Sequence, residues 1–222
     1  MTRVTLRVLD GADRGQVFEN LEVPITIGRE EGNSIQLNDE RISRFHIKIQ
    51  EDQDKLVLTD LESTNGTRVN GEDTQLRILR YGDVVSVGRS VLLFGTRDQI
   101  AGRLEGLRAD GVADTDSLNT SGTDVDSLSL ELRLGASEDL QSTLHIPLPP
   151  DLPNQLSAGQ AAQLSELLEY LHIRARQLVQ SSIVDDDQGE VKISLAQWQD
   201  LLDLQSQLAE YLRVIGDPGA EG

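Results

Sequence analysis

Three short polar clusters in the first third of the chain hold the residue types best suited to chemistry. The clusters are Gly28-Arg29 after "ITI", Ser43, Arg44 and His46 in "SRFHI", and Thr64, Asn65 and Asn70 in "DLESTNGTRVNG". An arginine guanidinium offers a rigid fork of N–H donors that suits a phosphate or a carboxylate. Hydroxyl groups donate to anionic oxygens, and an asparagine side chain can donate to and accept from an extended peptide. The clusters therefore indicate a site that recognises an anion.

The same residues do not indicate an enzyme. The clusters contain neither a pair of carboxylates nor a nucleophile beside a base. The chain has no Cys, and its three His residues are scattered at positions 46, 145 and 172, which argues against a metal site. The C-terminal part has no glycine-rich nucleotide loop. We expect no catalytic residues, no metal and no cofactor.

Strands must hold these clusters, because each cluster lies where a strand is expected to end. From residue 3 to about 96 the sequence consists of short β-branched segments with Gly, Asn and Asp between them. These segments are "RVTLRVL", "VPITIG", "SIQL", "FHIKIQ", "KLVLTD", "DVVSVG" and "SVLLFG". Many brief strands separated by turn residues predict an all-β sandwich or barrel. The Asn-Gly steps at 65–66 and 70–71 are turn signals, which taken alone indicate only hairpins.

In their order along the chain, "IGR", "SRFH" and "LTDLESTNGTRVNG" resemble the motifs of the forkhead-associated (FHA) domain, over roughly residues 3–96. Domains of this family are β-sandwiches whose loops bind peptides that carry phosphothreonine. The resemblance implies that Arg29 and Ser43 contact the phosphate and that Arg44 also reaches the phosphopeptide. It implies that Thr64 lines the pocket for the phosphate and the threonine methyl group, and that Asn65 holds the peptide main chain.

Other motif residues are expected to support the site rather than to touch the ligand. The resemblance implies this framework role for Gly28, His46, Gly66, Asn70 and Gly71, with a contact to the ligand as the alternative for Asn70. A lone histidine in such a position is more often structural than a ligand or an acid–base group. We therefore expect His46 to hold loops together.

Charge is distributed unevenly along the chain. The formal net charge is −18 and the pI is about 4.4, which argues against non-specific binding to nucleic acid or to an anionic membrane. Residues 1–97 hold 13 Lys and Arg against 16 Asp and Glu, so most of the excess lies in residues 98–222. A local positive patch is expected near the site, from Arg29, Arg41, Arg44 and Arg68. With no signal peptide and no membrane span in the sequence, we expect a cytoplasmic protein.

Residues 98–155 are rich in Asp, Ser, Thr and Gly and predict a flexible acidic linker after a domain of residues 1–97. Thr115, Thr120 and Thr123 lie in this segment, in surroundings that a kinase can reach. One hypothesis is that such a phosphorylated threonine binds the chain's own β domain and acts as an autoinhibitory switch. The commoner alternative is a solvated spacer.

Residues 156–216 predict an amphipathic helical hairpin, and residues 217–222 a disordered tail. Ser157 with Gln160, and Ser194 with Gln197, have the capping-box pattern that begins a helix. The connecting "VDDDQGEVKI" is either a small β-hairpin or a loop. Two helices alone bury little surface, so self-packing, self-association and docking on a partner all stay open. We expect Trp198 in the core of this unit.

Two functions remain after these exclusions. The leading one is a non-catalytic, phosphothreonine-dependent adaptor in signal transduction, which recruits partners phosphorylated by Ser/Thr kinases. The alternative is a phosphate-independent scaffold or assembly component that uses the FHA fold and the helical tail. Intact Arg29, Ser43 and Asn65 favour the first, because a phosphate-independent surface does not require that set. The partner, the kinase and the residue preferred three places after the phosphothreonine stay open.

Overall fold

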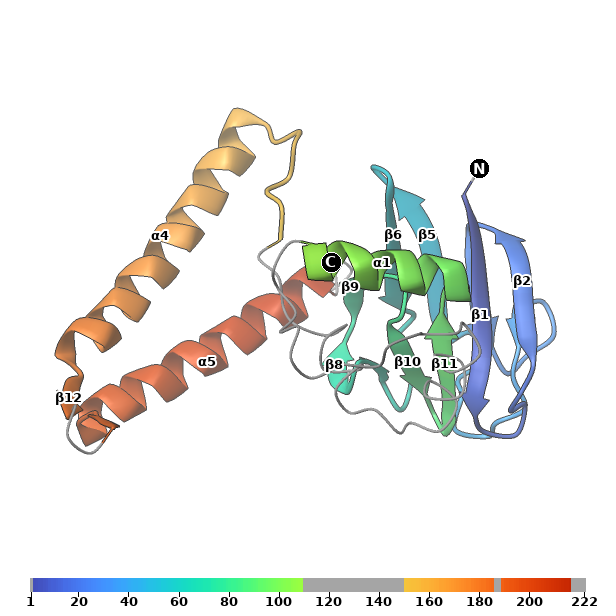
Figure 1. The fold of residues 1–222 in the computed structure, drawn as a ribbon, viewed down its shortest axis with the longest axis horizontal. Coiled ribbons are helices and arrows are strands. Elements are labelled where there is room, and N and C mark those ends of the chain that lie inside the picture. Colours follow the sequence, from blue (N-terminus) through green and yellow to red (C-terminus); the bar gives the residue numbers. More distant parts are fainter. Residues whose placement is uncertain (1, 110–149, 186–188, 217–222) are drawn as a thin grey trace. The chain divides into compact units, whose positions relative to one another are not determined.

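The computed structural model describes residues 2–109, 150–185 and 189–216. These residues fall into two compact units, one within residues 1–147 and the other within residues 148–222. We call the first the sandwich and the second the hairpin, and each is described by itself. The sandwich holds strands β1 to β11 and helix α1, and the hairpin holds α4, β12, β13 and α5 (Figure 1).

The sandwich contains two sheets. The six-stranded sheet has the order β2 (Val17–Glu22), β1 (Arg3–Asp10), β11 (Ser90–Phe94), β10 (Val84–Val87), β7 (Thr67–Val69) and β8 (Glu72–Thr74). The five-stranded sheet has the order β4 (Ile35–Gln36), β3 (Ile25–Gly28), β5 (Ile47–Asp52), β6 (Lys55–Asp60) and β9 (Leu76–Ile78). Neighbouring strands are antiparallel except β3 and β4. The predicted β-sandwich is confirmed.

An aliphatic core forms the interior of the sandwich. In β1, Val4, Leu6 and Val8 recur at every second position and are all buried, as a strand with one inward face requires. Phe94 is fully buried, and its ring stacks on that of Tyr81 with the centroids 5.7 Å apart. Since aromatic residues make up only 3% of the chain, Ile, Leu and Val supply most of the core.

Helix α1 (Arg97–Ala109) corrects the predicted domain boundary. We expected residues 98–155 to be linker, but residues 98–109 belong to this helix, which packs on the sandwich. Ile100, Leu104 and Leu107 share one helical face and are buried in one cluster with Leu93 of β11. The linker prediction is therefore wrong for this stretch, and the 4-3 spacing of the three apolar residues was the overlooked signal.

The hairpin consists of α4 (Ala158–Ser181), β12 (Ile183–Asp185), β13 (Glu190–Lys192) and α5 (Leu195–Gly216). Both predicted capping boxes are confirmed. The Gln160 N–H donates to Ser157 Oγ and the Ser157 N–H donates to Gln160 Oε1, and Ser194 and Gln197 exchange the same two bonds. The connection left open by the sequence contains the antiparallel pair β12–β13.

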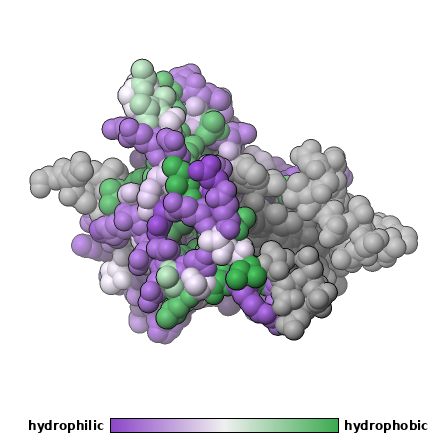
Figure 2. All heavy atoms as spheres, turned by 90° about the vertical axis from the view of Figure 1, so that its left-hand side faces the viewer, coloured by the Kyte–Doolittle hydropathy of each residue, from purple (hydrophilic) through white to green (hydrophobic). Residues whose placement is uncertain are grey.

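The hairpin has almost no interior of its own. No residue of α4 is buried, and Gly216 is the buried residue of α5. Trp198 is 48% exposed, so the prediction that it lies in the core is wrong for the single chain. Leu168, Leu202 and Leu212 are also exposed. Figure 2 shows such hydrophobic surface (green) between hydrophilic residues on the side of the molecule that it displays.

Some predictions fall outside the described residues. These are the rest of the linker at 110–149, with Thr115, Thr120 and Thr123, and the tail at 217–222. Within the described ranges, no helix has the length and apolar character needed to cross a membrane.

Candidate functional site

The end of β3 brings Gly28 and Arg29 against the segment that holds Ser43 and Arg44. The Arg29 N–H donates to the Ser43 carbonyl at 3.1 Å, and the Glu30 N–H donates to the Arg44 carbonyl at 3.3 Å. A Cβ on Gly28 would lie 2.1 Å from the Arg44 carbonyl oxygen, so only glycine permits this approach. Gly28 thus positions the two segments, and the exposed Arg29 side chain begins beside Ser43.

Ser43 and Thr64 join two loops. The Thr64 N–H donates to Ser43 Oγ at 3.0 Å, and the two hydroxyl oxygens lie 3.5 Å apart. The next residue, Asn65, donates from Nδ2 to the Arg41 carbonyl at 2.6 Å. These bonds hold the loop after β6 against the loop before β5, and Thr64 and Asn65 stay exposed to solvent.

His46 lies beneath both loops and is fully buried. Its Nδ1 accepts from the Ser43 N–H at 3.0 Å, so the ring proton is on Nε2, which faces the Gly66 carbonyl at 3.2 Å. Burial lowers the pKa of His46, although the Gly66 carbonyl and the nearby Asp60 act in the opposite direction. Both ring nitrogens are engaged in contacts that connect the Ser43 segment to the Gly66 turn.

Asp60 is a framework residue that sequence reasoning missed. It accepts from the Ser63 N–H at 2.7 Å, from the Ser63 hydroxyl at 2.6 Å and from the Thr67 hydroxyl. These bonds shape the turn that carries Thr64. The signal was an Asp three residues before a Ser in a turn segment, a spacing at which the carboxylate can cap the loop N–H groups.

The second Asn-Gly step has a different role from the first. Asn70 and Gly71 both have positive φ, 56° and 86°, and form the two-residue turn between β7 and β8. Asn70 Nδ2 donates to Asp83 Oδ1 at 3.1 Å, and Asn70 Oδ1 accepts from the Val84 N–H at 2.8 Å. This side chain is bonded within the fold, as a framework position requires. Asn65-Gly66, by contrast, lies where the chain crosses from one sheet to the other.

Positive charge at the site comes from fewer arginines than predicted. Arg29, Arg41 and Arg44 are exposed, and within the described part of the chain none of their guanidinium groups forms an ion pair. Arg68 instead pairs with Asp73 at 2.7 Å, so its inclusion in a free positive patch was wrong.

Asp39 fixes the loop on which Arg41 lies. Burial acts to raise the pKa of its carboxyl, but N–H bonds from Arg41 and Arg89 and the charges of these two residues outweigh that effect and lower the pKa. Asp39 is therefore held ionised. Its bonds connect the loop before β5 to the turn between β10 and β11.

The predicted contact residues all lie on segments that these bonds hold together, namely Arg29, Ser43, Arg44, Thr64 and Asn65. Together they present guanidinium, hydroxyl and amide donors at one edge of the sandwich. In the ranges that the structure describes, no group of His, Cys, Asp or Glu residues is arranged to hold a metal ion. The arrangement can bind an anion on a peptide, and it contains no paired acid and base.

Comparison with known proteins gives consistent matches. Residues 25–88 match the family model of the FHA domain. The FHA domain-containing protein FhaA of Mycobacterium tuberculosis is 38% identical over 92 residues, which make up 41% of this chain and 17% of FhaA. The oxoglutarate dehydrogenase inhibitor of Corynebacterium efficiens is 32% identical over 89 residues, 40% of this chain and 63% of the inhibitor. A solved structure from work on phosphothreonine-dependent FHA domain interactions is 37% identical, covers 43% of this chain and 97% of its own, and has a TM-score of 0.39.

The chain spans less than two thirds of the length of both named relatives. The segment matched by the family model lies inside the sandwich, from β3 to the end of β10, and contains all three polar clusters. This chain therefore carries an FHA domain, and the matched residues lie within the sandwich.

Proposed function

We propose that this protein is a non-catalytic phosphothreonine reader of the cytoplasm, which recruits partners phosphorylated by Ser/Thr kinases. The observation that carries the proposal is the junction of Ser43 with Thr64 beside Arg29. Two hydroxyl groups 3.5 Å apart, and an exposed guanidinium without a carboxylate partner among the described residues, supply donors for a phosphate.

The chemistry of the ligand fits this donor set. A phosphothreonine carries roughly −1.5 to −2 charges at neutral pH and three strong acceptor oxygens. Arg29 and Ser43 would bind the phosphate, with Arg44 close enough in sequence to reach the peptide. Thr64 would line the pocket for the phosphate and the threonine methyl group, and Asn65 would hold the peptide main chain. A glutamate should replace the ligand poorly, because it has less charge and fewer acceptor oxygens.

The alternative is a phosphate-independent scaffold, and the exposed apolar residues of the hairpin are the observation in its favour. The reader is preferred, because His46 accepts from the Ser43 N–H and Asp60 accepts from Ser63, the residue before Thr64, so that buried groups fix both loops. A surface that only packs against a partner gains nothing from that arrangement.

The test is a titration of the full chain with a phosphothreonine peptide library, beside matched phosphoserine and unphosphorylated peptides. We expect binding of phosphothreonine peptides alone. Arg29→Ala should weaken this binding by at least about 100-fold, because charge-assisted bonds to the phosphate are lost.

Lys55→Ala is the matched control. It removes the same charge from the start of β6, at the end of that strand away from Thr64, and should leave the affinity within about twofold of the original. Circular dichroism checks that both variants stay folded. Equal losses in the two variants, or no preference for phosphate in any peptide, would contradict the proposal.

A further inference from the structure

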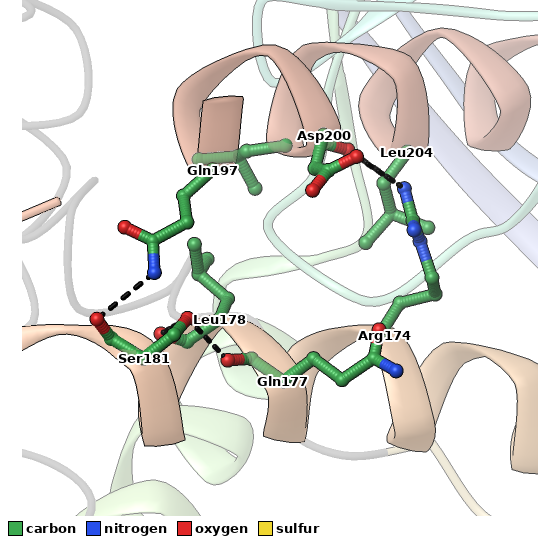
Figure 3. Close-up of a pocket in the computed structure, with 8 residues that line it drawn as sticks. Arg174, Gln177, Leu178, Ser181, Gln197, Asp200 and Leu204 are labelled. Carbon is green, nitrogen blue, oxygen red and sulfur yellow. Dashed lines mark hydrogen bonds and ion pairs between the residues drawn. The ribbon is translucent and has the colours of Figure 1, made fainter. Parts of the chain in front are cut away.

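The two helices of the hairpin contact one another near the turn that joins them and diverge away from it (Figure 1). Apart from Ile173, the half-buried residues of the two helices recur every three or four positions and are Ala161, Leu164, Leu167, Leu171, Arg174 and Leu178 on α4, with Gln197, Leu201, Leu204, Leu208 and Tyr211 on α5. Near the turn, Gln197 Nε2 donates to the Ser181 carbonyl at 2.9 Å, and Arg174 lies 3.6 Å from Asp200 (Figure 3). The helices therefore run antiparallel and are held together at the turn.

At the other end of the hairpin the contact is incomplete. A groove of about 410 Å³ separates Leu167 and Tyr170 of α4 from Tyr211, Val214 and Ile215 of α5. Together with the absence of any buried residue in α4, this shows that the two helices do not complete a core by themselves. A helical pair needs such a core to be stable.

The Arg174–Asp200 pair defines one side of the hairpin, and a second strip of apolar residues lies on the other side. Successive residues turn by about 100° around a helix. On α4 this turn places Leu168, Ala175 and Val179 on the side away from Arg174. On α5 it places Trp198, Leu202 and Leu212 on the side away from Asp200. Because the helices are antiparallel, the two strips face the same way, and we call them together the apolar face.

The apolar face has the width of two helices and carries no charge at its centre. Its remaining positions are small or neutral, with Ser165, His172 and Gln205 as the polar residues, and Arg176 lies at its border on α4. Arg213 borders the face and is paired with Glu210 at 2.7 Å. A charged partner would therefore find no opposite charge to pair with at the centre of this face. Only a small part of the large negative charge of the chain lies on these helices, since α4 contains two acidic and two basic residues and α5 contains three acidic residues and one basic residue.

The size of the face also fits association. Val179 and Leu212 are 72% and 70% exposed, and Leu168, Trp198 and Leu202 are about half exposed. Together they offer on the order of 500 Å² of apolar surface per copy, so two copies reach the roughly 1,000 Å² that a specific interface needs. Contiguous apolar patches of this size are often functional.

We propose that the apolar face binds the same face of a second copy of this chain, so that two hairpins form a four-helix bundle. A neutral face two helices wide can pair with the same face of a second copy about a twofold axis, and this pairing removes the apolar residues of both copies from water. The bundle gives the leucines and Trp198 the interior that the single hairpin lacks. The inference is independent of the phosphopeptide site.

Sedimentation of the full chain tests the proposal. We expect a species of twice the 24.4-kDa chain mass at micromolar concentration, which dissociates on dilution. Trp198 is the single tryptophan of the chain, so its fluorescence reports directly on the face. The emission maximum should move to longer wavelength on dilution, over the same concentration range in which the mass halves.

Two substitutions separate the face from the rest of α5. Leu202→Asp places a charge in the interface and should raise the dissociation constant by at least about 100-fold. Gln207→Asp adds the same charge on the opposite side of α5 and should change it by less than about threefold. Peptide binding per chain should be the same in both variants, which separates this proposal from the proposed function.

A chain that stays monomeric at high micromolar concentration would overturn the proposal. So would a dimer that Leu202→Asp leaves intact, or a Trp198 emission that does not follow the mass. The wild-type dilution series needs no variant, so it tests the interface even where Leu202→Asp fails to fold.

Discussion

The sandwich and the hairpin use apolar residues in opposite ways. In the sandwich, Leu6, Ile27 and Phe94 are fully buried by strands far apart in the sequence. In the hairpin, the helices have complete capping boxes and good apolar periodicity, yet their leucines stay partly exposed. Well-formed secondary structure therefore does not create a core by itself, because a core forms only between two packed layers.

The largest expected effect comes from removing the same side chain in both units. Leu6→Ala should lower the free energy of unfolding of the sandwich by about 3–5 kcal/mol, because it loses burial and leaves a cavity. Leu195→Ala should change the stability of the hairpin by less than about 0.5 kcal/mol, since Leu195 is 73% exposed.

Urea unfolding of the full chain measures both effects, with the β signal in circular dichroism for the sandwich and Trp198 fluorescence for the hairpin. Similar losses in the two variants would mean that the single hairpin already has a core at Leu195, and the two units would then not differ in this respect.

A glycine in each unit gives the next comparison. Gly28→Ala should destabilise the sandwich by about 1–3 kcal/mol, because its Cβ would overlap the Arg44 carbonyl and push the site segment away. Gly159→Ala should stabilise α4 by about 0.5–1 kcal/mol. The added Cβ meets no clash there, since its nearest neighbour is Ser157 Oγ at 4.0 Å.

Urea unfolding again gives the free energies, and the amide chemical shifts of residues 29 and 43–44 give the local change in the Gly28 variant. Unchanged shifts there, with unchanged stability, would show that the close approach at Gly28 is not required.

The smallest expected effect is a pH dependence that belongs to the sandwich. Burial lowers the folded-state pKa of His46 below its unfolded value of 6.5, so the unfolded state binds the extra proton first. Stability is therefore full above about pH 6.5 and falls as the pH drops toward the folded-state pKa, by at most about 1.4 kcal/mol per pH unit. An NMR titration of the imidazole measures the folded-state value directly, and a His46 midpoint above 6.5 would reverse the sign.

Sequence patterns sufficed for the parts of this molecule that depend on neighbours along the chain. Alternating apolar residues located the strands, and Ser157 and Ser194 located the helix starts through their own side-chain bonds. The polar clusters predicted that Arg29, Ser43 and Thr64 form one site. The fold brings their three segments together, and the part of each residue in binding stays a prediction.

The remaining features depend on contacts between distant residues. Arg68 forms an ion pair with Asp73 across the β7–β8 turn, and a count of the arginines near the site could not reveal this pairing. The burial of α1 depends on Leu93, which the composition of residues 98–155 cannot reveal. The exposure of Trp198 depends on how many helices pack around it, and the apolar periodicity of α5 does not reveal how many there are.

The pairing of β1 with β11 sets the order of events when this protein folds. β1 begins at residue 3, and its register places Leu6 opposite Phe94, so the first strand finds its neighbour only when nearly the whole domain exists. Pairing over such a span costs chain entropy before it yields contacts, which is typical of slow-folding β topologies. During synthesis, β1 cannot pair with β11 until β11 has left the ribosome. A fragment limited to residues 25–88 would lack both strands and could not close the six-stranded sheet.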